Sequence, residues 1–304
     1  MAVVTPCYSP DKELCRELHQ SVLDFTPSST VHHLIVPDAE MASFASFRGP
    51  RSVIWSYGEL LPPRFVPARW VNPVLQRLGG LAASVNVAAI NTRRPWPPIR
   101  GWILQQALKL AAAPRVDADV VVVVDADVQF IRPVSVSTFI RDGRLMLYRV
   151  EGGVHPGLPD HVAWHRVARR LLGLPEHEPP YHDYVTSPIA WDPKAVGALQ
   201  HRIETVTGRP WIDAVSAQRK FSECTLYGTF VDEVLGSPAN QVTTDRSRCH
   251  NYWDEVPMSA EKASEFAKAA PHDDMAVMIS AKSRTPMDIR RSAIAEIQAS
   301  TSRR

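Results

Sequence analysis

The sequence predicts an α/β fold: a single domain built on a mostly parallel central sheet with helices on both faces. Residues 120–124 are five consecutive valines, too β-branched to favour a helix and too few to cross a membrane. A continuous apolar run of this length is typical of a strand buried on both faces of a parallel sheet. Residues 2–6 and 31–36 form two further apolar runs, separated by a helical pattern over residues 11–25. This strand–helix–strand order predicts a βαβ unit with parallel strands.

The remaining elements follow from the same periodicities. We expect strands at 52–56, 145–150 and 275–279, and helices at 99–113, 162–172, 194–206 and from 222 onward. Residues 61–98 are rich in proline, arginine and tryptophan and receive no assignment. They form either an ordered excursion over the sheet edge or a mobile loop.

The composition sets limits on the kind of protein. A hydrophobic fraction of 45% and a charged fraction of 22% are ordinary for a soluble domain, and a formal charge of +2 gives no reason to expect nucleic acid as a partner. The four cysteines show no metal-binding spacing, so we expect them reduced. No transmembrane run and no signal-peptide pattern is present, which predicts a cytoplasmic protein; its oligomeric state is left open.

Two carboxylates follow the valine run directly. Asp125 and Asp127 are separated by one residue, and residues i and i+2 of an extended chain point the same way. Two converging carboxylates are ligands for Mg²⁺ or Mn²⁺, which proteins often share with phosphate groups. Because open α/β sheets bind ligands at the carboxyl ends of their strands, the pair predicts a metal site at that edge.

Three interpretations of the pair remain open. The two aspartates could only cap a turn. They could be the acid pair of a haloacid-dehalogenase-like phosphatase, although Gln129 stands where that family has Thr or Val and a βαβ-sized segment precedes the motif. They could be the Asp-x-Asp metal site of a nucleotide-sugar glycosyltransferase. Rossmann and P-loop chemistry are disfavoured because neither glycine-rich motif occurs.

Thr5, Pro6, Tyr8 and Asp38 are predicted at the same edge because they follow the first two strands, and further candidate residues occur later in the chain. The positions of the whole set are the ends of the first two strands, the helix before the valine run, a later helix start and a cluster near residue 250: Thr5, Pro6, Tyr8, Asp38, Gln106, Lys109, Glu223, Asp232 and His250. Gln106 and Lys109 belong either to a solvated helix face or to the ligand site. Glu223 follows Ser222, a good helix cap, so the helix dipole alone could explain it.

Taken together, these motifs resemble bacterial GT-A-type glycosyltransferases, in particular a poorly characterised actinobacterial-like group. The matching segments run in order along the chain: Val4–Ser9, His33–Asp38, Gly101–Trp102 with Gln105, Gln106 and Lys109, Asp125–Asp127, Ser187–Pro188, Ser222–Glu223 with Leu226–Gly228, and His250. The resemblance implies a GT-A-like domain over residues 1–255, with a nucleotide-binding half at about 1–130 and an acceptor half at about 131–255. Residues 256–304 are then a C-terminal extension.

The resemblance also implies a nucleotide-diphosphate sugar as donor. Thr5, Pro6, Tyr8 and Asp38 would hold the nucleoside, and Gln106 or Lys109 would contact phosphate or sugar. Asp125 would bind ribose and metal, and Asp127 and His250 would complete the ligands of a Mn²⁺ or Mg²⁺ ion that bridges the two phosphates.

On the acceptor side, Glu223 is the candidate catalytic carboxylate, with Asp232 as its rival. In an inverting enzyme, which we favour, Glu223 would take the proton of the acceptor hydroxyl; in a retaining one it would support an oxocarbenium-like state. The implied activity is a hexosyltransferase-type transfer to a glycan or natural-product hydroxyl. The alternatives are a nucleotidyltransferase or nucleotide-sugar-binding protein of similar fold, and the phosphatase.

Overall fold

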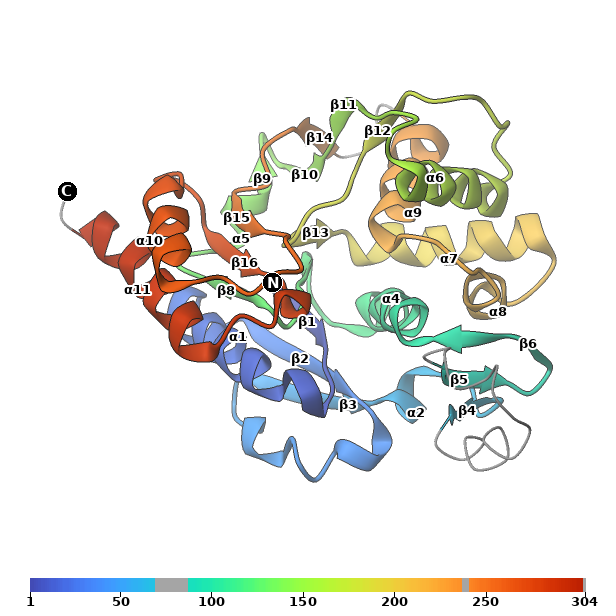
Figure 1. Cartoon of the computed structure of the whole chain (residues 1–304). Helices are drawn as coiled ribbons and strands as arrows, with labels where there is room; N and C mark the ends of the chain where they lie inside the picture. Colours follow the sequence, from blue (N-terminus) through green and yellow to red (C-terminus); the bar gives the residue numbers. More distant parts are fainter. Residues whose placement is uncertain (69–86, 237–240, 303–304) are drawn as a thin grey trace.

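The structure, a computed structural model, describes residues 1–68, 87–236 and 241–302. Its centre is a five-stranded sheet with the order β13-β7-β1-β2-β3. The strands are β13 (Ile189–Trp191), β7 (Val121–Val123), β1 (Ala2–Pro6), β2 (Val31–Val36) and β3 (Ser52–Ser56). β7, β1, β2 and β3 are parallel, and β13 runs antiparallel to β7 at the edge. The mostly parallel α/β sheet predicted from the sequence is therefore confirmed (Figure 1).

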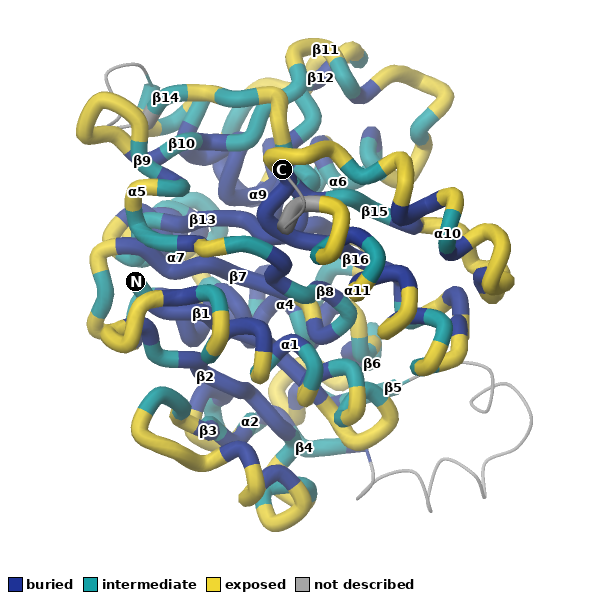
Figure 2. The backbone as a smooth tube through the Cα atoms, turned by 90° about the vertical axis from the view of Figure 1, so that its left-hand side faces the viewer, coloured by how far each residue is buried: buried dark blue, intermediate teal, exposed yellow. Residues whose placement is uncertain are grey.

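Helices cover both faces of this sheet because β1 is apolar on both sides. Val3 belongs to a cluster with Leu18 and Val22 of α1 (Lys12–Phe25). Its neighbour Val4 belongs to a different cluster, with Leu104 and other residues of α4 (Gly101–Ala112). This alternation is the period of two expected of a strand. The tube in Figure 2 shows β1, β2 and β7 buried at the centre of the molecule.

The strand register brings several carboxyl ends to one edge. Pro6 of β1 pairs with Ile35 of β2, and Val36 pairs with Ser56 of β3. The backbone N–H of Val124, just after β7, donates to the carbonyl of Val4 at 3.0 Å. The chain that follows each of these strands therefore starts at the same edge of the sheet.

A second group of helices packs on the α4 side and forms the right-hand part of Figure 1. It consists of α6 (Pro159–Leu172), α7 (Pro193–Thr207), α8 (Trp211–Ser216), α9 (Glu223–Thr229) and η5, a π-helical segment (Phe230–Leu235). Two small sheets border it, β14-β10-β9 and β11-β12. Their strands are β9 (Ile140–Arg141), β10 (Arg144–Tyr148), β14 (Gln241–Thr244), β11 (Val150–Val154) and β12 (Tyr181–Asp183).

The region without a sequence assignment contains an antiparallel sheet of β4 (Phe65–Pro67), β5 (Val87–Asn91) and β6 (Arg94–Arg100). β6 carries three prolines, which an edge strand tolerates because its outer N–H groups need no partner. Residues 69–86 lie outside the described residues.

The C-terminal part is joined to the rest through a sheet of its own. β16 (Ala276–Ile279) lies between β15 (Cys249–Tyr252) and β8 (Val128–Phe130). The helices α10 (Ala260–Ala269) and α11 (Met287–Ser302) pack on this sheet at the left of Figure 1. The short segments are η1 (Ser9–Asp11), η2 (Asp38–Glu40), η3 (Ala45–Phe47), η4 (Ala113–Arg115), η6 (Ala281–Ser283), α2 (Tyr57–Leu60) and α5 (Val136–Phe139). In the described part of the chain, no helix combines the length and apolar character that a membrane crossing requires.

Candidate active site

The acid pair lies directly after β7. The side chain of Asp125 is about half exposed, whereas that of Asp127 is largely covered by protein. Burial, and then the nearby charge of Asp125, raise the pKa of Asp127 to about 6; the N–H of Ala281 and the charge of Arg290 act in the opposite direction. The hydrogen bond from Ala281 to Asp127 Oδ2 is 2.7 Å long. The two aspartates are thus close enough to feel each other's charge, although Ala126 and Asp127 lie in a turn and not in the extended strand from which their convergence was predicted.

Lys109 connects this pair to a distant part of the sequence. Its Nζ lies 2.7 Å from Asp125 Oδ1 and 2.7 Å from Glu223 Oε1, and its side chain is buried. Burial alone would lower the pKa of a lysine, but the two carboxylates more than offset it and raise the pKa. Lys109 is therefore a charged amine that holds together two acids 98 positions apart in the sequence.

Glu223 is fixed at the first position of α9. The Ser222 side chain caps this helix by accepting the N–H of Thr225 at 3.3 Å, as the sequence predicted. The backbone N–H of Glu223 donates to Gln106 Oε1 at 2.8 Å, and Gln106 Nε2 donates to the carbonyl of Trp102. Gln106 and Lys109, three residues apart on α4, thus contact the same glutamate. Neither belongs to a solvated face, because both are buried.

At the nucleoside end the structure separates the predicted residues. Tyr8 is 38% exposed at the surface, but Thr5 is fully buried and its hydroxyl lies 3.0 Å from His32 Nε2. The side chain of Thr5 therefore points into the interior, because alternate residues of a strand face opposite sides. Pro6 is buried in β1. Asp38 accepts the N–H of Gly58 with both oxygens at 3.2 Å, so it is held at the start of α2.

Asp232, the rival of Glu223, has other partners. Arg149 Nη1 lies 3.2 Å from Asp232 Oδ2, and the hydroxyl of Tyr184 donates to the same oxygen at 2.7 Å. It lies more than two helical turns beyond Glu223, roughly 13 Å along the axis. The structure brings Glu223, and not Asp232, together with Lys109 and Asp125.

His250 does not join the acid pair. Its Nε2 lies 2.8 Å from the carbonyl oxygen of Phe266 in α10, and its ring stacks on the ring of Phe266 at 4.0 Å. Among the residues that the structure describes, no group of three or more His, Cys, Asp or Glu side chains is placed to hold a metal ion. His250 thus packs between β15 and α10. This placement disagrees with the prediction that His250 is a third ligand of the metal ion.

The two aspartates by themselves still fit part of a cation site. Burial, and then the carboxylate of Asp125 beside it, raise the pKa of Asp127, and a divalent cation would offset the cost of both. Carboxylate oxygens are hard donors that suit Mg²⁺ or Mn²⁺, and these ions commonly complete their shells with phosphate oxygens and water.

Several residues near the site were missed from the sequence. Tyr57, just after β3, has a pKa raised chiefly by burial, with smaller effects from the nearby acidic side chains, Asp38 among them. Glu40 Oε2 accepts the backbone N–H of Ser9 at 2.6 Å. The position of Tyr57 at a strand end was a usable signal. The contact from Ala281 could not be predicted, because it is made by a backbone N–H and the alanine side chain gives no indication of it.

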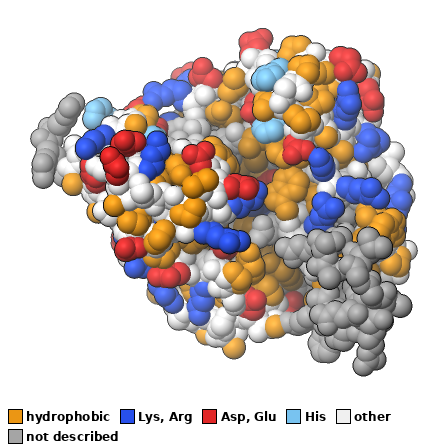
Figure 3. All heavy atoms as spheres, in the orientation of Figure 1, with side chains coloured by type: hydrophobic (Ala, Val, Ile, Leu, Met, Phe, Trp, Pro, Cys, Tyr) orange, Lys and Arg blue, Asp and Glu red, His pale blue; other side chains and the backbone are white. Residues whose placement is uncertain are grey.

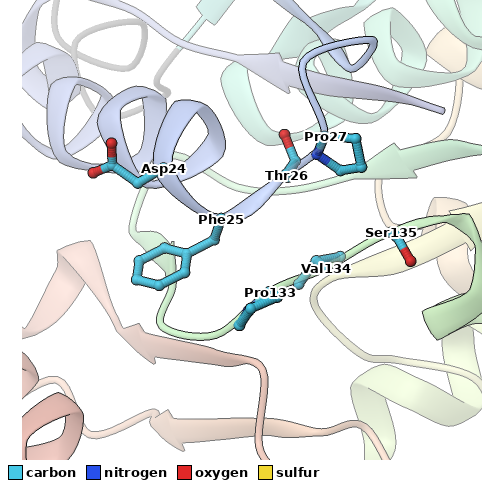
Figure 4. Close-up of a pocket in the computed structure, with 7 residues that line it drawn as sticks. All are labelled: Asp24, Phe25, Thr26, Pro27, Pro133, Val134 and Ser135. Atoms are coloured by element: carbon cyan, nitrogen blue, oxygen red, sulfur yellow. The ribbon is translucent and has the colours of Figure 1, made fainter. Parts of the chain in front are cut away.

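A separate shallow cavity of about 270 Å³ lies between the end of α1 and the segment after β8 (Figure 4). Its lining residues are Asp24, Phe25, Thr26, Pro27, Pro133, Val134 and Ser135. The lining is mainly apolar and has one acid. It shares no residue with the group formed by Gln106, Lys109, Asp125 and Glu223, which we name the Lys109 cluster. We therefore place the functional site at Lys109 and not in this cavity.

Known proteins with similar folds include three glycosyltransferases. They are mouse xyloside xylosyltransferase 1 in its apo form, an active-site variant of LgtC, and the bifunctional enzyme WbbM in its apo form. Their identities to this chain are 10%, 14% and 10%, and their TM-scores are 0.44, 0.46 and 0.46. The alignments cover 94%, 99% and 91% of this chain, and 100%, 96% and 45% of the other chains.

All three are glycosyltransferases, the class of enzyme that the sequence motifs resemble. At identities this low and TM-scores below 0.5 the likeness is too distant to bear on activity. No curated protein matches the chain in sequence. A family model, described as "Family of unknown function (DUF6492)", matches residues 4–291. This match extends over most of the 304 residues and includes every residue of the Lys109 cluster, so the chain belongs to the family DUF6492.

Proposed function

We propose that this protein is a metal-dependent glycosyltransferase that moves a sugar from a nucleotide-diphosphate donor to a hydroxyl of an acceptor. The observation that carries the proposal is the position of Lys109 Nζ, 2.7 Å from Asp125 and 2.7 Å from Glu223. Lys109 thereby joins the acid pair at the edge of the central sheet to a carboxylate of α9, which belongs to the second group of helices. This arrangement suits a transferase, because it would hold donor and acceptor side by side between two carboxylate groups.

On the donor side, Asp125 and Asp127 would hold the cation, and Tyr8, Asp38 and Tyr57 would line the place of the nucleoside. Bound there, a divalent cation supplies charge stabilisation to the departing diphosphate. Asp127 must be ionised to serve as a ligand. Its raised pKa predicts that cation binding strengthens as the pH rises through about 6.

On the acceptor side, Glu223 would act as general base. Lys109 occupies Oε1, and Gln106 holds the backbone N–H, so the carboxylate is fixed in direction. Oε2 would accept the proton of the acceptor hydroxyl while that oxygen bonds to the anomeric carbon. The bond from the anomeric carbon to the diphosphate oxygen breaks in the same step, and the nucleoside diphosphate leaves with the electron pair.

The test is the identity of the released product. The purified protein is incubated with nucleotide-diphosphate sugars, candidate acceptors and Mn²⁺, and we expect acceptor-dependent release of nucleoside diphosphate. Glu223→Gln should lower kcat by about two orders of magnitude or more, as loss of a general base does. Glu261→Gln is the matched control, because Glu261 is exposed in the first turn of α10, a helix also capped by serine.

Other products would contradict the proposal. Release of pyrophosphate would indicate nucleotidyl transfer. A phosphorylated Asp125, detected by mass spectrometry of the trapped protein, would indicate a phosphatase.

A further inference from the structure

Three polar or aromatic residues lie along one side of α4. Trp102, Gln106 and Lys109 are spaced four and three residues apart, so they share a helix face. Gln106 and Lys109 contact Glu223, whereas Trp102, at the exposed start of the helix, is 45% exposed. Trp102 lies two turns, roughly 10 Å along the axis, from Lys109. The α4 face therefore leads from the candidate catalytic carboxylate to an exposed indole.

Trp102 belongs to an aromatic surface made by two helices. Its ring lies 5.5 Å from that of Trp164 on α6, at an angle of 44°. The ring of Trp164 lies 4.4 Å from that of His161, one turn earlier on the same helix. We name Trp102, Trp164 and His161 the aromatic platform. Figure 3 shows hydrophobic side chains gathered over α4 beside a hollow at the centre of this face.

The platform has a polar atom that the protein leaves unpaired. In the described part of the chain, the buried Nε1 of Trp164 has no hydrogen-bond partner. His161 Nδ1 also lacks a hydrogen bond, but it faces Asp183 Oδ1 at 3.6 Å, within ion-pair distance. A buried N–H without an acceptor costs free energy, which a ligand hydroxyl at this place would offset.

We propose that the aromatic platform binds a sugar ring of the acceptor, one unit away from the ring whose hydroxyl reacts at Glu223. This rests on the proposed glycosyltransfer and makes the acceptor an oligosaccharide or a glycoconjugate. A sugar ring has apolar C–H faces and a rim of hydroxyls. It therefore matches an exposed indole bordered by the unpaired N–H of Trp164 and by the side chain of His161. The distance of roughly 10 Å along α4 between Trp102 and Lys109 is wider than one ring, so the reacting unit would lie between the platform and Glu223.

The donor nucleoside is a poorer occupant of this surface. Its expected place is beside Tyr8, Asp38 and Tyr57, after β1, β2 and β3 of the central sheet. The platform instead lies on α4 and α6. The platform and the nucleoside place thus belong to different elements of the fold.

The experiment compares the full-length wild type with Trp102→Ala and Trp102→Phe. The control is Trp96→Ala, which removes an indole that is 71% exposed on β6. Binding of glucose, galactose, mannose and xylose, and of disaccharides built from them, is measured by saturation-transfer NMR without donor. We expect wild-type binding of at least one disaccharide, roughly two- to tenfold weaker in Trp102→Ala, partly restored in Trp102→Phe and unchanged in Trp96→Ala.

A second measurement uses turnover. Trp102→Ala should raise the KM for a disaccharide acceptor and leave the KM for the donor unchanged. Three outcomes would overturn the proposal that the platform binds an acceptor sugar. They are equal saccharide binding by wild type and Trp102→Ala, no binding of any saccharide by the wild type, and a change in donor KM alone. Saccharide binding that depends on Trp102 in a protein that releases no nucleoside diphosphate would contradict the proposed function and leave the platform intact.

Discussion

Lys109 is the residue on which the geometry of the candidate site depends most. An amine buried without partners would lose its charge, but here two carboxylates hold it in the ammonium form. Each partner stabilises the charge of the other. The side chain of Glu223 is only 8% exposed, and the ammonium group of Lys109 allows this carboxylate to stay ionised although it is buried.

Replacing Lys109 by methionine should therefore destabilise the fold as well as remove activity. We expect the free energy of unfolding to fall by roughly 3 kcal/mol, because a buried carboxylate is left without its partner. Urea denaturation measures this change. The double variant Lys109→Met with Glu223→Gln should lose less than the sum of the two single losses. Lys194→Met, at an exposed lysine on α7, is the control, and an equal loss there would refute the argument.

Asp127 should make stability depend on pH in an unusual direction. Its pKa is about 6 in the fold, against an ordinary value of 3.8 for an aspartate, so between these values the folded state binds more protons than the unfolded state. The stability contributed at this site therefore falls as the pH rises from about 4 through 6. Above pH 6 the fold bears the full free-energy cost of a buried, ionised carboxylate. Asp127→Asn removes that cost. We expect the variant to be more stable by about 1 to 3 kcal/mol at neutral pH and equal to wild type near pH 4.

The measurement is urea denaturation of both proteins at pH values on either side of 6. Mn²⁺ provides a second readout without turnover. It should raise the Tm of the wild type above pH 6 and leave that of Asp127→Asn unchanged. A variant less stable than wild type at neutral pH would show that the hydrogen bond from Ala281 outweighs the burial of charge.

At the scale of elements, α9 positions Glu223 through a close approach to a neighbouring segment. A Cβ at Gly228 would lie 2.2 Å from Cγ of Tyr184, a buried ring whose hydroxyl binds Asp232. Only glycine allows α9 to lie this close. The end of α9 is thereby held against the segment between β12 and β13. At the start of the helix, Cys224 Sγ contacts the carbonyl of Thr186 in the same segment at 3.9 Å.

Two glycines in helices should therefore respond oppositely to the same change. Gly228→Ala forces a methyl group into the Tyr184 ring and should cost roughly 3 kcal/mol. Gly197→Ala on α7 meets no atom within 4 Å and should stabilise the fold by about 0.5 to 1 kcal/mol, because alanine favours helix. Thermal and urea denaturation test both variants. Equal effects would show that the packing of α9 against Tyr184 is looser than described.

At the scale of the whole molecule, the C-terminal part is built into the central structure. β16 pairs with β8 on one side and with β15 on the other, and its four residues are all buried. Arg291 of α11 also contacts Glu13 and Glu17 of α1. We expect a chain without residues 256–304 to lose cooperative unfolding, because β8 would then expose an unpaired apolar edge.

Circular dichroism during urea titration would detect that loss. A chain shortened only by residues 299–304 retains β16, α10 and the buried residues of α11 through Ile297, and should unfold as the full chain does. A stable, cooperatively folded fragment of residues 1–255 would contradict the expectation and support an independent extension.

The sequence predicted the parts of the fold whose signals are local. The valine run, the βαβ unit and the helix before the valines all have strong periodicity, and each is present within a few residues of its expected bounds. The direction of β13 was not readable, because strand direction depends on the path of the chain between strands. The proline-rich strand β6 was missed because proline is a signal against strands.

The candidate site was partly predictable for the same reason. Asp125, Asp127, Lys109, Gln106 and Glu223 were selected by residue type and position, and the structure brings them together. Thr5 and His250 were selected in the same way, but their side chains face His32 and Phe266. Which way one side chain of a strand points depends on register and packing, and a single sequence does not reveal these.

The hydrogen bond from Ala281 to Asp127 joins residues 154 positions apart and has a consequence during synthesis. When Asp127 leaves the ribosome, its partner has not yet been translated. At about 5 to 20 residues per second, the acid pair waits on the order of 8 to 30 s for the segment that covers it. During that time the edge of β8 that later pairs with β16 is open to other strands. In the cell this interval, and not the finished fold, is the stage at which the protein is most exposed to aggregation.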